Sequence, residues 1–282
     1  MNELPLVIFT VLVQGAVGLF LCLGLVSILF PKTGEQAMNK AFVATMVMFG
    51  IGATAAIFHL GTPVRAFNVL NGVSHSSPLS LEIVALSLFG ASAVAYTGMR
   101  LFNLQPALRK VLLPVAMVLG LVLVYAIAQV YTLSTVPTWD SGWTLFQFLM
   151  TAGVIGPVGA MTLLRWQSAS AGHYQKMADR GLATFGLMML VVAVTCFVGF
   201  VVYLGGLTLH SNPLAMMDYH STLMLARVAL MMVGVICAAV SATRGNHQVT
   251  GVAALCFLLV VVAEVMGRIF FYDIHISASA GM

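Results

Sequence analysis

Charged residues are the scarcest class in this 282-residue sequence. Only 12 Lys and Arg and 8 Asp and Glu are present, or 7% of the chain, where a globular protein has about a quarter. A water-facing surface cannot be assembled from so few, and the 61% of hydrophobic residues exceed what a fold of this size buries. A soluble domain is therefore excluded, and most of the chain must face lipid.

Paired cysteines are also missing. The four cysteines stand singly in apolar runs with no C-x-x-C pair, at Cys22, Cys196, Cys237 and Cys256. This spacing offers neither an iron–sulfur cluster nor a zinc site, so no metal is expected, and buried apolar packing is their expected role. With a net charge of only +4, nucleic acid is not an expected partner. A basic n-region is absent before the first apolar stretch, so we expect that stretch to be a retained span.

Long apolar windows account for most of the chain, and each approaches the length of about 20 residues that a membrane crossing needs. Eight windows satisfy this: 4–30, 41–60, 79–99, 111–133, 142–164, 182–207, 220–243 and 250–272. Residues 181–217 carry no charge, but that run is too short for two crossings and a loop, so we count it once. The prediction is an all-α polytopic membrane protein, an eight-helix bundle forming one integral domain over residues 1–282.

The basic residues are distributed unevenly between alternate loops. Nine fall in the loops after spans one, three, five and seven: Lys32, Lys40, Arg100, Arg109, Lys110, Arg165, Lys176, Arg180 and Arg244. Arg65 is alone in the loops of the opposite side. The positive-inside rule then places both termini outside the cytoplasm, and we interpret these Lys and Arg as topology signals. Aromatic rings at the predicted span ends are expected at the membrane interface: Trp139, Trp143, Trp166 and Tyr272.

Five ionisable residues lie inside predicted spans or at their ends: His59, Glu82, Arg227, Glu264 and Arg268. A charge at the centre of a membrane helix costs roughly 2.5–3.5 kcal/mol on insertion scales, so such residues mark candidate functional sites. His59, Glu82, Arg227 and Arg268 all lie toward the predicted non-cytoplasmic face. Charges placed only for packing would have no reason to gather at one side.

These ionisable residues also have purely structural interpretations. Glu264 and Arg268 are spaced i and i+4 and can neutralise each other on one helix face. Arg227 can pair with Glu82 or with Glu264. Glu82 and Arg268 can instead snorkel to the headgroups, His59 can be purely structural, and Arg65 can bind lipid phosphate.

Several stretches of the sequence form a recognisable pattern. The longest is residues 59–68, His-Leu-Gly-Thr-Pro-Val-Arg-Ala-Phe-Asn. Others are residues 6–10, residues 135–139, Gly267-Arg268 with Phe271-Tyr272, and His275. Together they resemble the membrane-anchor subunit of bacterial dimethyl sulfoxide reductase and its relatives. The resemblance extends over almost the whole length.

The resemblance implies an eight-helix anchor in the bacterial inner membrane that oxidises menaquinol near the outer face during anaerobic respiration. Electrons would pass to an iron–sulfur subunit and then to a molybdopterin catalytic subunit, both docked on the non-cytoplasmic face. The chain would contain no haem and no iron–sulfur cluster, and would not itself perform the terminal reduction. The family's quinol-site histidine falls on His59 and a family glutamate on Glu82, although Leu81 stands where the family has asparagine.

Quinol oxidation fits these residue types. The reaction releases two electrons and two protons, and a histidine with a pKa near 6.5 can bond a ring oxygen and accept a proton. Glu82 would relay that proton outward, while Arg65, Arg227 and Arg268 would help to bind the quinol or tune its partners. Two other classes remain: a secondary transporter, which usually places charges at the midplane with internal repeats, and a purely structural anchor.

Overall fold

The computed structural model describes residues 3–59, 72, 75, 77–166, 173–207, 213–244 and 250–275. Within these ranges the backbone alone is described for residues 58, 59, 213–220, 243, 244 and 250. All regular structure in the described part is helical: α1 (Leu4–Leu29), α2 (Glu35–His59), α3 (Pro78–Leu101), α4 (Pro106–Tyr131), α5 (Gly142–Trp166), α6 (His173–Gly206), α7 (Pro213–Arg244) and α8 (Thr250–Asp273). Over that part of the chain, eight helices are long and apolar enough to cross a membrane, as the sequence predicts.

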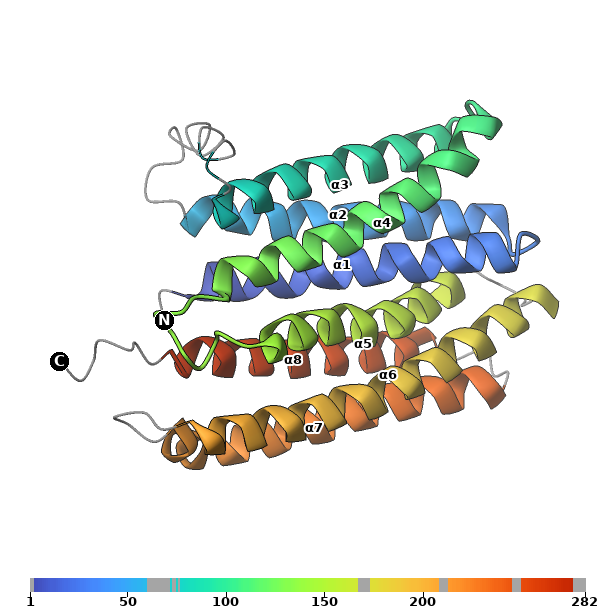
Figure 1. The fold of residues 1–282 in the computed structure, drawn as a ribbon. Helices are drawn as coiled ribbons and strands as arrows, with labels where there is room; N and C mark the ends of the chain where they lie inside the picture. The colour runs from blue at the N-terminus through green and yellow to red at the C-terminus, as the bar shows by residue number, and fades with distance from the viewer. Residues whose placement is uncertain are drawn as a thin grey trace.

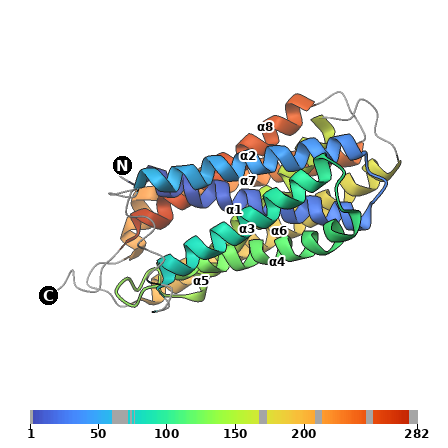
Figure 2. The same ribbon diagram turned by 90° about the horizontal axis from the view of Figure 1, so that it is seen from above.

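The helices run roughly along one axis, and α1 lies between α2–α4 and α5–α8 (Figure 1). The first residue of α1 and the last of α8 are at the same end of the bundle, and Figure 2 shows the same elongated arrangement from above. We call this the terminal end, and the other the loop end. An even number of crossings produces this arrangement.

Proline marks several helix starts. Pro78 opens α3, Pro106 opens α4 and Pro213 opens α7, because a helix's first turn needs no donor from the proline nitrogen. Side-chain hydroxyls within the helices donate to the preceding turn, as Thr45 does to the carbonyl of Ala41 at 2.9 Å. This removes an unpaired hydroxyl from an apolar environment.

The helices α1 and α5 cross closely at their glycines. A Cβ added to Gly156 would lie 2.6 Å from the carbonyl carbon of Gly18, and one added to Gly18 would overlap the backbone of Ala152. Small residues permit this approach, as is usual between membrane helices. The outer helices instead expose large apolar side chains, such as Val202 of α6 and Leu225 of α7, as a lipid-facing surface requires.

The expectation that two aromatic side chains face the membrane interface is wrong. Trp139 and Tyr272 were expected at the membrane interface, but they are 9% and 6% exposed because they pack inside the protein.

Arg165 is more than a topology signal. Its Nε lies 3.1 Å from Oδ2 of the buried Asp179, and Nη1 donates to Ser241 at 2.7 Å, which ties α5 to α6 and α7.

Candidate functional site

A cavity of about 310 Å³ opens at the terminal end of the bundle. The first turns of α1 and α3 and the last turns of α2 and α4 form its walls. Its lining is apolar except for two side chains, Glu82 and Tyr131; the others are Leu6, Phe9, Ala56, Leu79, Ile83, Leu86 and Val130. Pockets for small molecules commonly combine such apolar walls with a few polar groups.

Glu82 is buried, with 6% of its surface exposed. It therefore does not snorkel to the membrane surface, which corrects one of the structural interpretations. Its Oε1 has no hydrogen-bond partner among the described residues. An acceptor in this position is costly unless something else satisfies it, so Glu82 is suited to bind a polar group of a molecule in the cavity.

Of two other predicted site residues, one is placed by its backbone alone and the other lies outside the described residues. His59 is the last residue of α2, one turn beyond the cavity-lining Ala56, so its backbone reaches the same end of the bundle. Its side chain lies outside the described part of the protein, as does the whole of Arg65.

Tyr131 connects this cavity to α8. Its hydroxyl lies 2.9 Å from the hydroxyl of Tyr272, and both rings are buried. Sequence reasoning missed Tyr131, because a tyrosine at the end of an apolar run gives no sign of its partner.

Two of the stretches that carry the resemblance meet beside this tyrosine pair. In the connector between α4 and α5, the Trp139 Nε1 donates to the carbonyl of Phe271 at 2.8 Å. Thr138 Oγ1 donates to the carbonyl of Ile274 at 2.8 Å. These donors satisfy carbonyls at the C-terminal end of α8, which otherwise lack helical partners. The connector therefore fixes the end of α8 that carries Tyr272.

Arg268 lies one turn before Tyr272 and is 4% exposed, so it does not snorkel either. Its Nη2 donates to Gln14 Oε1 at 2.7 Å and to Thr151 Oγ1 at 3.1 Å. The guanidinium carbon lies 3.7 Å from the ring centre of Phe148, in the range of cation–π contacts. Uncharged groups from two neighbouring helices, α1 and α5, thus hold this charge of α8.

Thr151 also links Arg268 to Glu264. Its hydroxyl donates to Glu264 Oε2 at 2.7 Å, so it bridges the two residues that their spacing had suggested as a pair. Glu264 Oε1 lies 3.7 Å from Nη2 of Arg227, which makes Glu264, not Glu82, the acidic partner that the structure gives Arg227. We call Gln14, Thr151, Arg227, Glu264 and Arg268 the polar network.

Gly267 makes room for this network. A Cβ at this position would overlap the guanidinium of Arg227, so the glycine lets that side chain lie across α8. Neither Arg227 nor Arg268 is among the residues that line the Glu82 cavity. The structure therefore separates these two arginines from Glu82 and places the tyrosine pair between Arg268 and the cavity.

Among the described residues, no group of three or more His, Cys, Asp or Glu side chains could hold a metal ion. Cys22, Cys196 and Cys256 are buried free thiols and Cys237 is exposed.

Comparison with known proteins gives a match over nearly the whole length. The family described as DMSO reductase anchor subunit (DmsC) matches residues 1–274. One chain of the anaerobic dimethyl sulfoxide reductase of Escherichia coli (strain K12) is 33% identical over 286 residues, which cover 98% of this protein and 96% of the relative. The anaerobic dimethyl sulfoxide reductase protein YnfH of the same organism is 30% identical over 284 residues, which cover 98% and 96%.

A third relative belongs to the anaerobic dimethyl sulfoxide reductase of Haemophilus influenzae (strain ATCC 51907 / DSM 11121 / KW20 / Rd). It is 31% identical over 280 residues, which cover 98% of this protein and 95% of the relative. Together with the eight apolar helices, these matches show that the protein belongs to the dimethyl sulfoxide reductase anchor subunit family.

Proposed function

We propose that this protein anchors a dimethyl sulfoxide reductase-like complex in the bacterial inner membrane and oxidises menaquinol in the Glu82 cavity. The observation that carries the proposal is a buried carboxylate with an unpartnered oxygen in an otherwise apolar cavity of about 310 Å³. Apolar walls suit a naphthoquinol ring and its isoprenoid tail. The carboxylate provides the polar contact that such a ring needs.

The chemistry divides between two residues. A quinol loses two protons and two electrons when it becomes a quinone. His59, at the end of α2, bonds one ring oxygen and accepts the two protons in turn. Glu82 passes each proton to the water at the terminal end, which returns His59 to its neutral form before the second transfer. Arg65 supplies a positioning charge in the connector after α2. An ionisable side chain inside a membrane bundle is a functional candidate by default.

The electrons leave to an iron–sulfur subunit and then to a molybdopterin subunit, both docked at the terminal end. Membership in an anchor subunit family supports a partner of this kind, and so do relatives named as parts of a reductase. If the terminal end faces outward, protons and electrons leave on the same side and the reaction moves no net charge across the membrane.

Arg227 and Arg268 act as positioning residues in this scheme. They hold α1, α5, α7 and α8 together through the polar network and so fix the face of α8 that carries Tyr272. Tyr272 in turn bonds Tyr131, which lines the cavity. Their effect on the quinol therefore passes through the tyrosine pair.

Turnover in membranes tests the quinol assignment. His59→Ala should abolish quinol-dependent reduction, and Glu82→Gln should slow it less because water and other outer groups can relay the proton. Glu3→Gln is a matched control, since Glu3 is exposed at the same end outside the cavity. An artificial electron donor to the partner subunits reports assembly. Full quinol activity in His59→Ala, with assembly intact, would leave a purely structural anchor as the better interpretation.

The tyrosine pair offers a second test of the cavity. Tyr131→Phe removes a hydroxyl from the cavity lining, whereas Tyr272→Phe breaks the same hydrogen bond without changing that lining. If the Tyr131 hydroxyl bonds the quinol, Tyr131→Phe should raise KM by about fivefold, the effect of losing one neutral hydrogen bond. Tyr272→Phe should raise KM less. Equal effects on KM would mean that the pair stabilises the fold and does not contact the substrate.

A further inference from the structure

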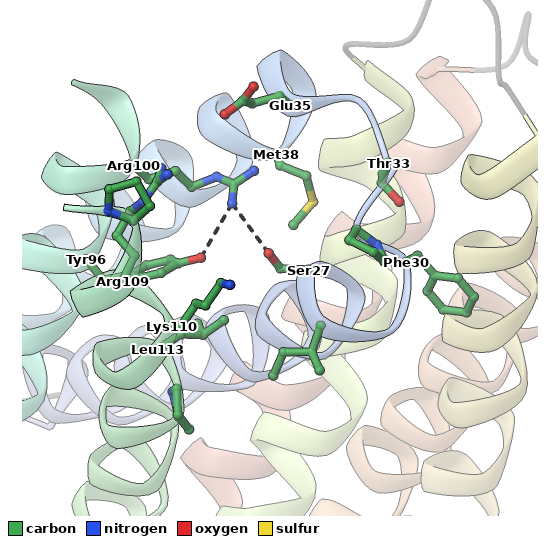
Figure 3. A pocket seen from close by; sticks show the side chains of 14 residues that line it. Ser27, Phe30, Thr33, Glu35, Met38, Tyr96, Arg100, Arg109, Lys110 and Leu113 are labelled. Atoms are coloured by element: carbon green, nitrogen blue, oxygen red, sulfur yellow. Dashed lines mark hydrogen bonds between the residues drawn. The ribbon is translucent and has the colours of Figure 1, made fainter. Parts of the chain in front are cut away.

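A second and larger cavity lies at the loop end of the bundle, far from Glu82. Its volume is about 660 Å³, within the range of roughly 300–1,000 Å³ typical of small-molecule sites. It is formed by the last turn of α1, the connector to α2, the first turn of α2, the last turns of α3 and the first turns of α4. Figure 3 shows its lining side chains.

Positive charge dominates this cavity. Arg100, Arg109 and Lys110 line it against one acidic residue, Glu35. In Figure 3 the Arg100 guanidinium and the Lys110 amine both lie within the ring of lining side chains. This arrangement favours a ligand that carries one or two negative charges.

Arg100 is held in place by uncharged groups. Its Nε donates to Asn39 Oδ1 at 2.7 Å, and its Nη1 donates to Ser27 Oγ at 3.4 Å and to the Tyr96 hydroxyl at 3.5 Å. These partners orient the guanidinium but do not neutralise it. Arg109 is oriented in the same way, because its Nη2 donates to Asn103 Oδ1 at 3.1 Å.

A buried hydroxyl gives an independent indication of a ligand. Thr33, in the connector between α1 and α2, lines the cavity and is 6% exposed. Its Oγ1 has no hydrogen-bond partner among the described residues. A buried hydroxyl without a partner is unfavourable, and an anionic oxygen in the cavity would satisfy it.

The remaining walls are apolar. Ile28, Phe30, Met38 and Leu113 line the cavity, and Ile28 is also 53% exposed on the outer surface of α1. A molecule with a charged head and an apolar tail could therefore place the head in the cavity and the tail along the lipid-facing surface. A free phosphate ion would make no use of these walls.

We propose that this loop-end cavity binds the phosphate head group of an anionic phospholipid. Arg100, Arg109 and Lys110 contact the phosphate, the Thr33 hydroxyl donates to one of its oxygens, and the acyl chains leave past Ile28. Basic pockets between membrane helices commonly bind anionic head groups in this way. Three of the basic residues interpreted as topology signals thus acquire a second role, which is independent of the quinol proposal.

Native mass spectrometry of the purified full-length protein in detergent tests the proposal, with phosphatidylglycerol, phosphatidylcholine and inorganic phosphate as probes. The wild-type protein should retain one phosphatidylglycerol in preference to phosphatidylcholine. Arg109→Gln with Lys110→Gln should weaken phosphatidylglycerol binding by roughly 10- to 30-fold. Lys176→Gln with Arg180→Gln removes two exposed charges outside the cavity at the same end and should leave binding unchanged.

Thr33→Val keeps the shape of the side chain and all of the charge, so it tests the site even if the double variant folds poorly. It should weaken phosphatidylglycerol binding by roughly tenfold. Equal binding of the two lipids, equal losses in the two double variants, or an unchanged affinity in Thr33→Val would overturn the proposal. Inorganic phosphate that displaces phosphatidylglycerol from the protein would overturn it as well, because the site would then be one for a soluble anion.

Discussion

Two arginines of this bundle are held by uncharged side chains. Arg268 is buried and bonds Gln14 and Thr151, and the partly exposed Arg100 bonds Asn39, Ser27 and Tyr96. Several hydrogen-bonding groups together stabilise the charge, and they also fix the orientation of the charged side chain. Each charge therefore depends on residues that look unremarkable in the sequence.

The ion pair between Arg227 and Glu264 should contribute to the stability of the fold. Glu264→Ala leaves Arg227 and Arg268 without their acidic neighbour, and should lower the free energy of unfolding by about 3 kcal/mol. Adding Arg227→Leu should recover part of that loss, because one of the two uncompensated charges is then gone. Unfolding in mixed detergent micelles measures the free energy of unfolding of Glu264→Ala and of the double variant. The two single variants, Glu264→Ala and Arg227→Leu, are the references for the double variant. Strictly additive losses would show that the 3.7 Å pair contributes no coupling.

The polar network was only partly predictable from the sequence. The charged members were visible because Asp, Glu, Lys and Arg are rare in apolar runs, and Arg227 was correctly given Glu264 as one of two possible partners. Gln14, Thr151 and Tyr131 were missed because one uncharged polar residue in a span does not indicate which helix it faces. Burial inside the protein also could not be separated from placement at the lipid interface, so Trp139 and Tyr272 were assigned to the wrong environment.

At the scale of helices, the crossing of α1 and α5 organises the bundle. α1 contacts α2, α4, α5 and α8, and so joins the helices that form the Glu82 cavity to those that carry the polar network. The small residues Gly18, Ala152 and Gly156 allow the two backbones to touch. Any side chain added at this crossing must move a backbone and not merely another side chain.

Gly18→Ala should therefore destabilise the protein. The added methyl group meets the backbone of Ala152, which cannot rotate away, and overpacking of this kind typically costs about 1–3 kcal/mol. Gly50→Ala is the matched control, since a Cβ there meets nothing within 4 Å and alanine is the better helix former. Thermal unfolding in detergent compares the two. A loss no larger in Gly18→Ala than in Gly50→Ala would mean that α1 and α5 are less tightly packed than the structure indicates.

Helix number was easier to predict than helix length. All eight windows correspond to helices, and the charge-free run of residues 181–217 was rightly counted once, because α6 ends at Gly206 before Pro213 opens α7. α2 begins at Glu35 instead of residue 41, and α6 at His173 instead of residue 182. The predicted windows end at charged residues, whereas a helix can continue beyond the hydrocarbon where charges are tolerated.

At the scale of the molecule, the two cavities lie at opposite ends of the half formed by α1–α4. The apolar cavity with Glu82 is at the terminal end, and the basic cavity is at the loop end. This polarity agrees with the nine basic residues in the odd-numbered loops, which predict that the loop end is cytoplasmic. In that orientation the proposed quinol site would lie near the outer face, and the proposed anionic-lipid site near the inner face.

Reporter fusions check the orientation. A phosphatase fused after residue 282 should be active, because that enzyme works only outside the cytoplasm, and the same phosphatase fused after Phe102, between α3 and α4, should be inactive. The reverse pattern would invert the proposed orientation and move the quinol site to the cytoplasmic side.

Photolabelling can locate the quinol site in the protein directly. A photoreactive menaquinol analogue added to membranes containing the complex should label residues 6–9, 79–86 and 130–131, the segments that line the Glu82 cavity. Glu82→Gln should reduce that labelling, and Glu3→Gln should not. Labelling confined to α6 and α7, or to the loop-end cavity, would contradict the account.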